Sequence, residues 1–137
     1  MRARFGLAAA LFVTATATAA PAWSDPAPLT GSWVGEMNEP GGEPSRYSIQ
    51  VNMVLDRTGA AVATVRYGTL NCGGAWLRPS SFQGRWRLEE VITDDPAGRC
   101  MAQTDVELTP ANGGLTARWF EPESDVMLAT AELRRAN

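Results

Sequence analysis

The sequence predicts an all-β domain, most simply an antiparallel up-and-down barrel of about eight strands. Three observations support this fold class. Short runs alternate between apolar and polar side chains, which is the period of a strand with one buried face. Glycine and proline separate these runs at hairpin spacing, and the chain holds 13 Gly and 9 Pro in 137 residues. No segment after residue 24 keeps the period of an amphipathic helix.

The alternating runs follow one another along the chain with turn sequences between them. The predicted strands cover residues 29–37, 46–55, 60–67, 74–78, 82–92, 100–108, 115–121 and 126–133. In residues 46–55, for example, every second residue from Tyr47 onward is large and apolar, and the residues between are mostly polar. Asp56–Gly59 and Asn112–Gly114 have the composition of tight hairpin turns. These features indicate consecutive antiparallel hairpins.

Short antiparallel strands of this number form either a two-sheet sandwich or a closed barrel. Hairpin-length connections favour a meander, and closure of the sheet removes its exposed edges, so we expect the barrel. An eight-stranded barrel is filled by side chains or holds one small ligand. Longer loops are expected at Asn38–Pro44 and Glu121–Asp125.

The first 24 residues have the order of a secretory signal peptide. Arg2 and Arg4 precede an apolar run over residues 5–13, and small residues around Ala22 offer a cleavage site before Asp25. The apolar run is too short to span a bilayer. We therefore expect a single β-barrel domain, residues 25–137, that is periplasmic or secreted and has no membrane anchor.

Charge and residue content exclude several function classes. All 12 basic residues are Arg, against 15 acidic ones, and removing residues 1–24 leaves a net charge of 10 − 15 = −5. Scattered arginines on an acidic chain give no binding surface for nucleic acid. The absence of His and Lys from the sequence removes catalytic triads, His-ligated zinc and Schiff-base chemistry. Glu89 and Glu90 are adjacent on a strand and point to opposite faces. We predict no enzyme activity, cofactor or metal.

Two cysteines in an exported chain predict a disulfide, Cys72–Cys100. Such a bridge closes a loop of about 29 residues and contributes roughly 3–4 kcal/mol in the chain-entropy model. Gly73 and Gly74 fit a bulge or a close approach of backbones beside it. The chain has no Cys-x-x-Cys sequence, so a redox-active pair is not expected.

The Gly-x-Trp of Gly31-Ser32-Trp33 resembles the opening signature of the calycins, which include the lipocalins and avidins. The resemblance implies that Trp33 closes one end of the barrel and that an arginine of the last strand, Arg134 or Arg135, lies across its ring. After Trp33 the chain reads Val34-Gly35-Glu36-Met37 and lacks the Asn and Ser that avidins use for biotin, so biotin is not expected.

A longer stretch, from Trp33 to Trp119, resembles small secreted bacterial β-barrel domains of unknown function. The matching positions are Trp33 and Gly35; Tyr67, Leu70, Cys72, Gly73 and Gly74; Glu90 and Ile92; and Gly98 and Cys100. This resemblance implies the fold and brings no activity with it.

Glu90 is the most informative single residue, because alternation places it on the apolar face with Trp86. A buried glutamate needs a partner. Either it is a polar anchor in a ligand pocket lined by Tyr47, Tyr67 and Trp86, or it lies near a barrel rim or pairs with an arginine such as Arg99 or Arg118.

Two functions from different classes follow from this sequence. The first is a non-catalytic binding module that takes a small apolar or amphipathic ligand in the barrel mouth. The second is a protein-interaction module, such as an inhibitor of an extracellular hydrolase, that presents its longer loops to a partner. An open lumen with Glu90 at its wall favours the first, and a filled lumen with a projecting loop favours the second.

Overall fold

The computed structural model describes residues 13–14 and 25–136, so the predicted signal peptide lies outside the described residues except for Val13 and Thr14. A 3₁₀ turn, η2 (Ala27–Leu29), leads into eight strands. The strands are β1 (Gly31–Asn38), β2 (Arg46–Leu55), β3 (Ala61–Tyr67), β4 (Cys72–Phe82), β5 (Arg85–Asp94), β6 (Gln103–Ala111), β7 (Gly114–Phe120) and β8 (Met127–Arg135). In this described part, no helix has the length and apolar character that crossing a bilayer requires.

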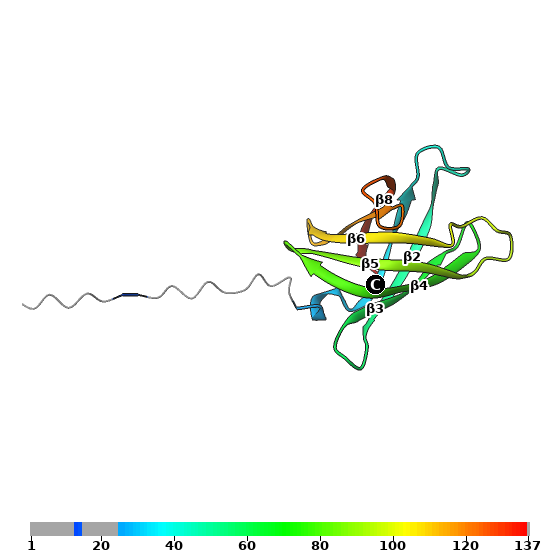
Figure 1. Cartoon of the computed structure of the whole chain (residues 1–137). Helices are drawn as coiled ribbons and strands as arrows, with labels where there is room; N and C mark the ends of the chain where they lie inside the picture. Colours follow the sequence, from blue (N-terminus) through cyan, green and yellow to red (C-terminus); the bar gives the residue numbers. More distant parts are fainter. Residues whose placement is uncertain (1–12, 15–24, 137) are drawn as a thin grey trace, which may run out of the picture.

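The strands form one closed antiparallel barrel in sequence order, which confirms the predicted fold class over the sandwich. Each strand pairs with the next one along the chain, and β1 pairs with β8 to close the sheet. Figure 1 shows the strands wrapped around a common interior. Because every strand has two neighbours, the sheet has no free edge.

Most strand boundaries shift by one to four residues from the sequence prediction, and one difference changes the position of a side chain. The predicted strand over residues 82–92 is divided, because a turn at Gln83 and Gly84 separates β4 from β5. Both turn residues have positive φ, 50° and 76°, as a tight hairpin turn requires. Phe82 therefore lies at a hairpin tip and is 72% exposed, whereas Trp86 is buried. Alternation alone cannot reveal such a turn when apolar residues continue on both sides of it.

The barrel has two ends of different construction. One end, which we call the closed end, carries the β2–β3, β4–β5 and β6–β7 turns. The start of β1 and the end of β8 lie at the same end. The four connections β1–β2, β3–β4, β5–β6 and β7–β8 lie at the other, the open end. In Figure 1 the β1–β2 loop, drawn in cyan, projects beyond the open end at the top of the view.

Trp33 and Arg135 cover the closed end. The Trp33 ring is 4% exposed, and the Arg135 guanidinium lies 4.3 Å from its centre. Trp33 Nε1 donates to the Leu29 carbonyl at 2.8 Å. Arg135 donates to the carbonyls of Thr30 (2.5 Å) and Pro28 (2.6 Å). This is the arrangement that the calycin resemblance implied.

The residues around this stack explain the Gly-x-Trp sequence and the choice of arginine. Gly31 has a φ of +116°, and a Cβ there would lie 2.8 Å from Arg135 Nη1, so a side chain at this position would displace the guanidinium. Arg134, the other candidate, pairs with Val34 and lies one residue out of phase with buried Leu133. It therefore faces outward and takes no part in the closure.

The predicted disulfide joins Cys72, at the start of β4, to Cys100, in the β5–β6 loop. The adjacent glycines make the expected close approach: a Cβ on Gly74 would lie 2.0 Å from the Val91 carbonyl oxygen, and one on Gly73 would lie 2.7 Å from that of Val65. A register shift between the two glycines marks a bulge. The bridge thus holds the β5–β6 loop to the open end.

Candidate functional site

A cavity at the open end

The open end contains a cavity of about 70 Å³ among the inward-facing residues of the barrel. Side chains fill most of the interior, as an eight-stranded barrel allows. The cavity is lined by Met37, Glu39, Tyr47, Tyr67, Leu70, Glu90, Arg99, Cys100, Met101, Thr104, Trp119, Leu128 and Ala129. Its walls are thus mainly apolar and aromatic, with a few polar groups among them, which is the composition of small-molecule sites.

Glu90 is the buried carboxyl group of the cavity wall, at 4% exposed. Its Oε2 accepts hydrogen bonds from the Tyr67 hydroxyl at 2.6 Å and from Trp76 Nε1 at 2.7 Å. The same oxygen accepts a third bond from Trp119 Nε1 at 3.2 Å. Within residues 25–136, Oε1 accepts a single long hydrogen bond, from Thr104 Oγ1 at 3.4 Å. Oε2 therefore accepts three hydrogen bonds, whereas Oε1 accepts only the one long bond from Thr104 among the described residues.

Strand register brings these donors together. Trp76 on β4 and Thr104 on β6 are the direct cross-strand partners of Glu90 on β5. Tyr67 and Trp119 reach Oε2 from β3 and β7. The Trp76 and Trp119 rings also meet edge to face, with centroids 6.1 Å apart, which fixes the direction of both indole N–H groups.

The pKa of Glu90 is raised above its ordinary value of 4.5, because burial penalises the charged form. The four donated hydrogen bonds act in the opposite direction without cancelling that effect. Burial also raises the pKa of Tyr67, so its hydroxyl keeps its proton and remains a donor to Glu90.

A second carboxylate, Glu39, lies among the residues that line the cavity. Its Oε2 accepts a hydrogen bond from the Tyr47 hydroxyl at 2.5 Å. Burial, and after it this contact with Glu39, raises the pKa of Tyr47. The Tyr47 ring meets Tyr67 edge to face at 5.8 Å, so the two tyrosines form one wall. The wall connects Glu39 to Glu90 through aromatic rings.

A β-bulge supplies part of the opposite wall. In the β7–β8 pair, Trp119 faces Ala129 and Phe120 faces Met127, which leaves Leu128 as an extra residue. Strict alternation would turn either Leu128 or Ala129 outward, yet both line the cavity. Bulges commonly redirect a side chain in this way.

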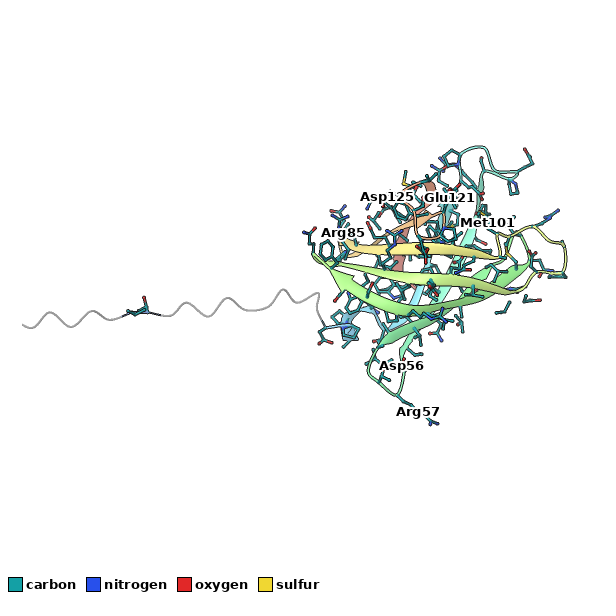
Figure 2. The ribbon with its side chains drawn as sticks, viewed as in Figure 1. Asp56, Arg57, Arg85, Met101, Glu121 and Asp125 are labelled. Carbon is teal, nitrogen blue, oxygen red and sulfur yellow. A yellow bond between two sulfur atoms is a disulfide. The ribbon has the colours of Figure 1, made fainter. Side chains whose placement is uncertain are left out.

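The β5–β6 loop contributes Arg99, Cys100 and Met101 to the cavity wall at the open end. Met101, in the β5–β6 loop, is 49% exposed, and Figure 2 shows it far from the Asp56–Arg57 turn of the closed end. Arg99, in the same loop, is exposed and also lines the cavity. Asp95 shapes this loop by accepting the backbone N–H groups of Arg99 (2.9 Å) and Cys100 (3.0 Å).

The structure brings together three of the four predicted ligand-binding residues: Tyr47, Tyr67 and Glu90 line the cavity. Trp86 does not. It is buried toward the closed end, opposite Leu108, and its Nε1 has no hydrogen-bond partner among the described residues. Trp119 takes the place in the cavity wall that the sequence argument gave to Trp86.

The expected arginine partners of Glu90 are not observed, and Glu90 does not lie exposed on a rim. Arg118 pairs with Glu107 at 3.6 Å. Within residues 25–136, none of the ion pairs includes Glu90 or Arg99. Glu90 accepts hydrogen bonds from neutral groups and not from an arginine, because Trp76, Thr104 and Trp119 share the inward face of the barrel with it. The inward positions of these three residues in the alternating pattern could have identified them as candidate partners of Glu90.

One group of three described residues also places potential metal-ligating atoms close together: Cys72, Asp95 and Cys100. The two sulfur atoms are bonded to each other. Hydrogen bonds from two backbone N–H groups lower the pKa of Asp95, first from Cys100 and then from Arg99. This group is therefore explained by the disulfide and its loop.

Comparison of the chain with protein-family models, with curated proteins and with solved structures finds no match.

Proposed function

We propose that this protein is a non-catalytic binding module that takes a small amphipathic ligand at the open end of its barrel. The observation that carries the proposal is the cavity of about 70 Å³ bounded by aromatic rings and the buried carboxylate of Glu90. A cavity needs only about 10–15 Å³ for one water, so this one has room for a head group and a few carbons of a ligand. The rest of such a ligand lies against the exposed side chain of Met101.

The compartment and the relationship to other barrels belong to the same proposal. A disulfide is typical of the periplasm and of secreted proteins, in line with the signal-like sequence of residues 1–24. The stack of Arg135 on Trp33 and the Gly31-Ser32-Trp33 sequence support a calycin-like barrel.

Native mass spectrometry of the protein purified from its own cell envelope tests the binding function. We expect a retained small molecule in the wild type. Ala129→Leu adds bulk to a cavity wall residue that is 4% exposed, and it should abolish retention. Leu55→Ala, at an exposed position of the closed end, is the control and should retain the ligand. Equal retention by Ala129→Leu would contradict the proposal.

A second candidate function is a protein-interaction module such as a hydrolase inhibitor. One observation favours it: the lumen is largely filled, while the acidic β1–β2 loop, residues 39–45, projects from the barrel (Figure 1). In that case the purified protein should carry a protein partner in place of a small molecule. Shortening the β1–β2 loop, with the cavity left intact, should then release the partner.

A further inference from the structure

Glu90 is a buried acid with hydrogen bonds but no opposite charge. A buried carboxylate is costly unless it is paired, and hydrogen bonds from neutral groups offset only part of the cost. No ion pair among the described residues reaches it. The described part of the fold thus places a carboxyl group in the wall of a cavity without supplying a cation to pair with it.

The unused acceptor capacity of this carboxylate is on one oxygen. An ionised carboxylate has about four lone-pair sites, two on each oxygen. Oε2 already takes three donors at 2.6, 2.7 and 3.2 Å. Oε1 has only the contact with Thr104 at 3.4 Å, which is at the limit of a hydrogen bond. When Glu90 is ionised, a ligand that reaches it therefore meets an oxygen that can accept further hydrogen bonds.

The other charged groups and the rings around the cavity also favour a cation. Glu39 and Glu90 carry two negative charges, and Arg99 carries one positive charge, so the lining has a net charge of −1. Arg99 is exposed, and solvent and salt screen its repulsion of a second cation. Tyr47, Tyr67 and Trp119 present aromatic rings, which attract cations electrostatically.

From these observations, and resting on the proposed function, we infer that the ligand carries a primary ammonium group that donates to Glu90 Oε1. Its apolar part leads out of the cavity past Leu128 and Met101. The ammonium is small enough for the space, and its three N–H donors match both Oε1 and the Thr104 hydroxyl oxygen. The contact is a charge-assisted hydrogen bond to a buried carboxyl group.

A matched series of n-hexylamine, n-hexanol and hexanoate at pH 7 tests this inference. These probes have the same chain and differ in the head group, which is cationic, neutral or anionic. The indole N–H resonances of Trp76 and Trp119 report the cavity, because both groups donate to Glu90. The Trp33 indole, bonded to Leu29 at the closed end, is an internal control that should not move.

We expect saturable shifts at Trp76 and Trp119 and a Kd for hexylamine that is about tenfold or more below that of hexanol. Hexanoate should bind most weakly. Hexanol or hexanoate binding as tightly as hexylamine would overturn the inference while leaving the binding function intact. If none of the three probes shifts Trp119 saturably, the proposed function fails, and the ammonium site fails with it.

Two variants, each of which removes one acidic group, distinguish a direct contact with Glu90 from the electrostatic effect of the protein's overall charge. Glu90→Gln should reduce the preference for hexylamine over hexanol to within about threefold. Glu89→Gln, one residue away on the outward face and paired with Arg78, should keep the full preference. A preference that survives Glu90→Gln, or that Glu89→Gln also removes, would overturn the inference.

Thr104→Val provides an independent check, since it leaves the Glu90 side chain unchanged and removes the one hydrogen bond that Oε1 accepts from the described residues. Hexylamine should still bind this variant at least half as tightly as it binds the wild type. Loss of the preference for the amine in Thr104→Val would show that the hydroxyl, and not Oε1, is the anchor, and would overturn the assignment to Glu90. The probe series on the wild type decides the question even if Glu90→Gln does not fold.

Discussion

The two ends of the barrel use the same kinds of side chain in opposite ways. At the closed end, a tryptophan and an arginine satisfy each other and nearby carbonyls: the Trp33 indole donates to Leu29, and Arg135 stacks on the ring and donates to Thr30 and Pro28. At the open end, two tryptophans donate to Glu90, and no arginine pairs with it among the described residues. The first arrangement is complete within the chain. The second leaves an acceptor oxygen beside a cavity.

This difference indicates what each end contributes. A complete set of contacts stabilises the fold and needs no further molecule. An incomplete set in a cavity is a cost to the fold that a ligand can offset. Substitutions at the closed end should therefore change mainly the free energy of unfolding, whereas Glu90 substitutions should change mainly binding and its pH dependence.

Trp33→Ala should have the largest effect on stability. Removing a buried ring leaves a cavity at the closed end, and the free energy of unfolding should fall by about 3–5 kcal/mol. Urea unfolding measured by circular dichroism gives this value. If the two ends act separately, hexylamine should still bind the folded variant as it binds the wild type. A loss below about 1 kcal/mol would show that Trp33 does not hold the closed end together.

Loss of the disulfide should come next. Cys72→Ser together with Cys100→Ser should lower the free energy of unfolding by roughly 3–4 kcal/mol in the chain-entropy model. Because the bridge ties the β5–β6 loop to the open end, this variant should also weaken ligand binding, unlike Trp33→Ala. Stoichiometric thiol labelling of the native wild-type protein would contradict the disulfide itself.

The fold could be predicted from the sequence because it depends on local patterns, whereas the closure by Trp33 and an arginine was implied by the resemblance of Gly31-Ser32-Trp33 to the calycin opening. Alternation and turn residues specify hairpins, and consecutive hairpins leave few ways to close a sheet. Alternation could also have distinguished the two arginines. Leu133 faces inward, and Arg135, two residues later, lies on the same side of β8, whereas Arg134 does not. The Gln83-Gly84 turn was missed because no change in apolar character marks it.

The open end was predicted only in part, because its contacts connect residues far apart in the chain. The position of Glu90 on the apolar face followed from its phase in the strand, but this left open whether it lines a pocket, lies near a rim or pairs with an arginine. Its partners did not follow from this phase, since one comes from each of four strands and register alone decides which residues meet. Trp86 and Trp119 are equally apolar in sequence. Their different positions along the barrel axis place only Trp119 at the cavity.

Arg135→Ala should destabilise the protein by about 1–2 kcal/mol, through loss of the cation–π contact and of hydrogen bonds to two carbonyls. Arg134→Ala is the matched control, because Arg134 faces outward from the same strand. Its effect should stay within about 0.5 kcal/mol. Equal effects of the two substitutions, measured by urea unfolding, would remove the special role of Arg135 in the closure.

Glu90→Gln should have the smallest effect on the free energy of unfolding at low pH, and this effect should change with pH. Burial raises the pKa of Glu90 in the folded state above its ordinary value of 4.5. Below pH 4.5 the carboxyl is protonated in both states, so it does not shift the folding equilibrium with pH. Between 4.5 and the raised folded pKa, the unfolded chain ionises first, and rising pH therefore favours unfolding.

The stability of the wild type should thus fall, relative to Glu90→Gln, as pH rises from 4.5 through the folded pKa of Glu90. Free energies of unfolding measured in urea at intervals from pH 4 to 8 give this difference, and contributions from Asp56 and Asp95 cancel in it because both proteins retain them. Glu89→Gln keeps Glu90 and should follow the wild type. A difference that stays flat or grows in favour of the wild type would mean that the four hydrogen bonds outweigh burial. Saturating hexylamine should reduce the fall, because an ammonium on Oε1 stabilises the ionised folded state.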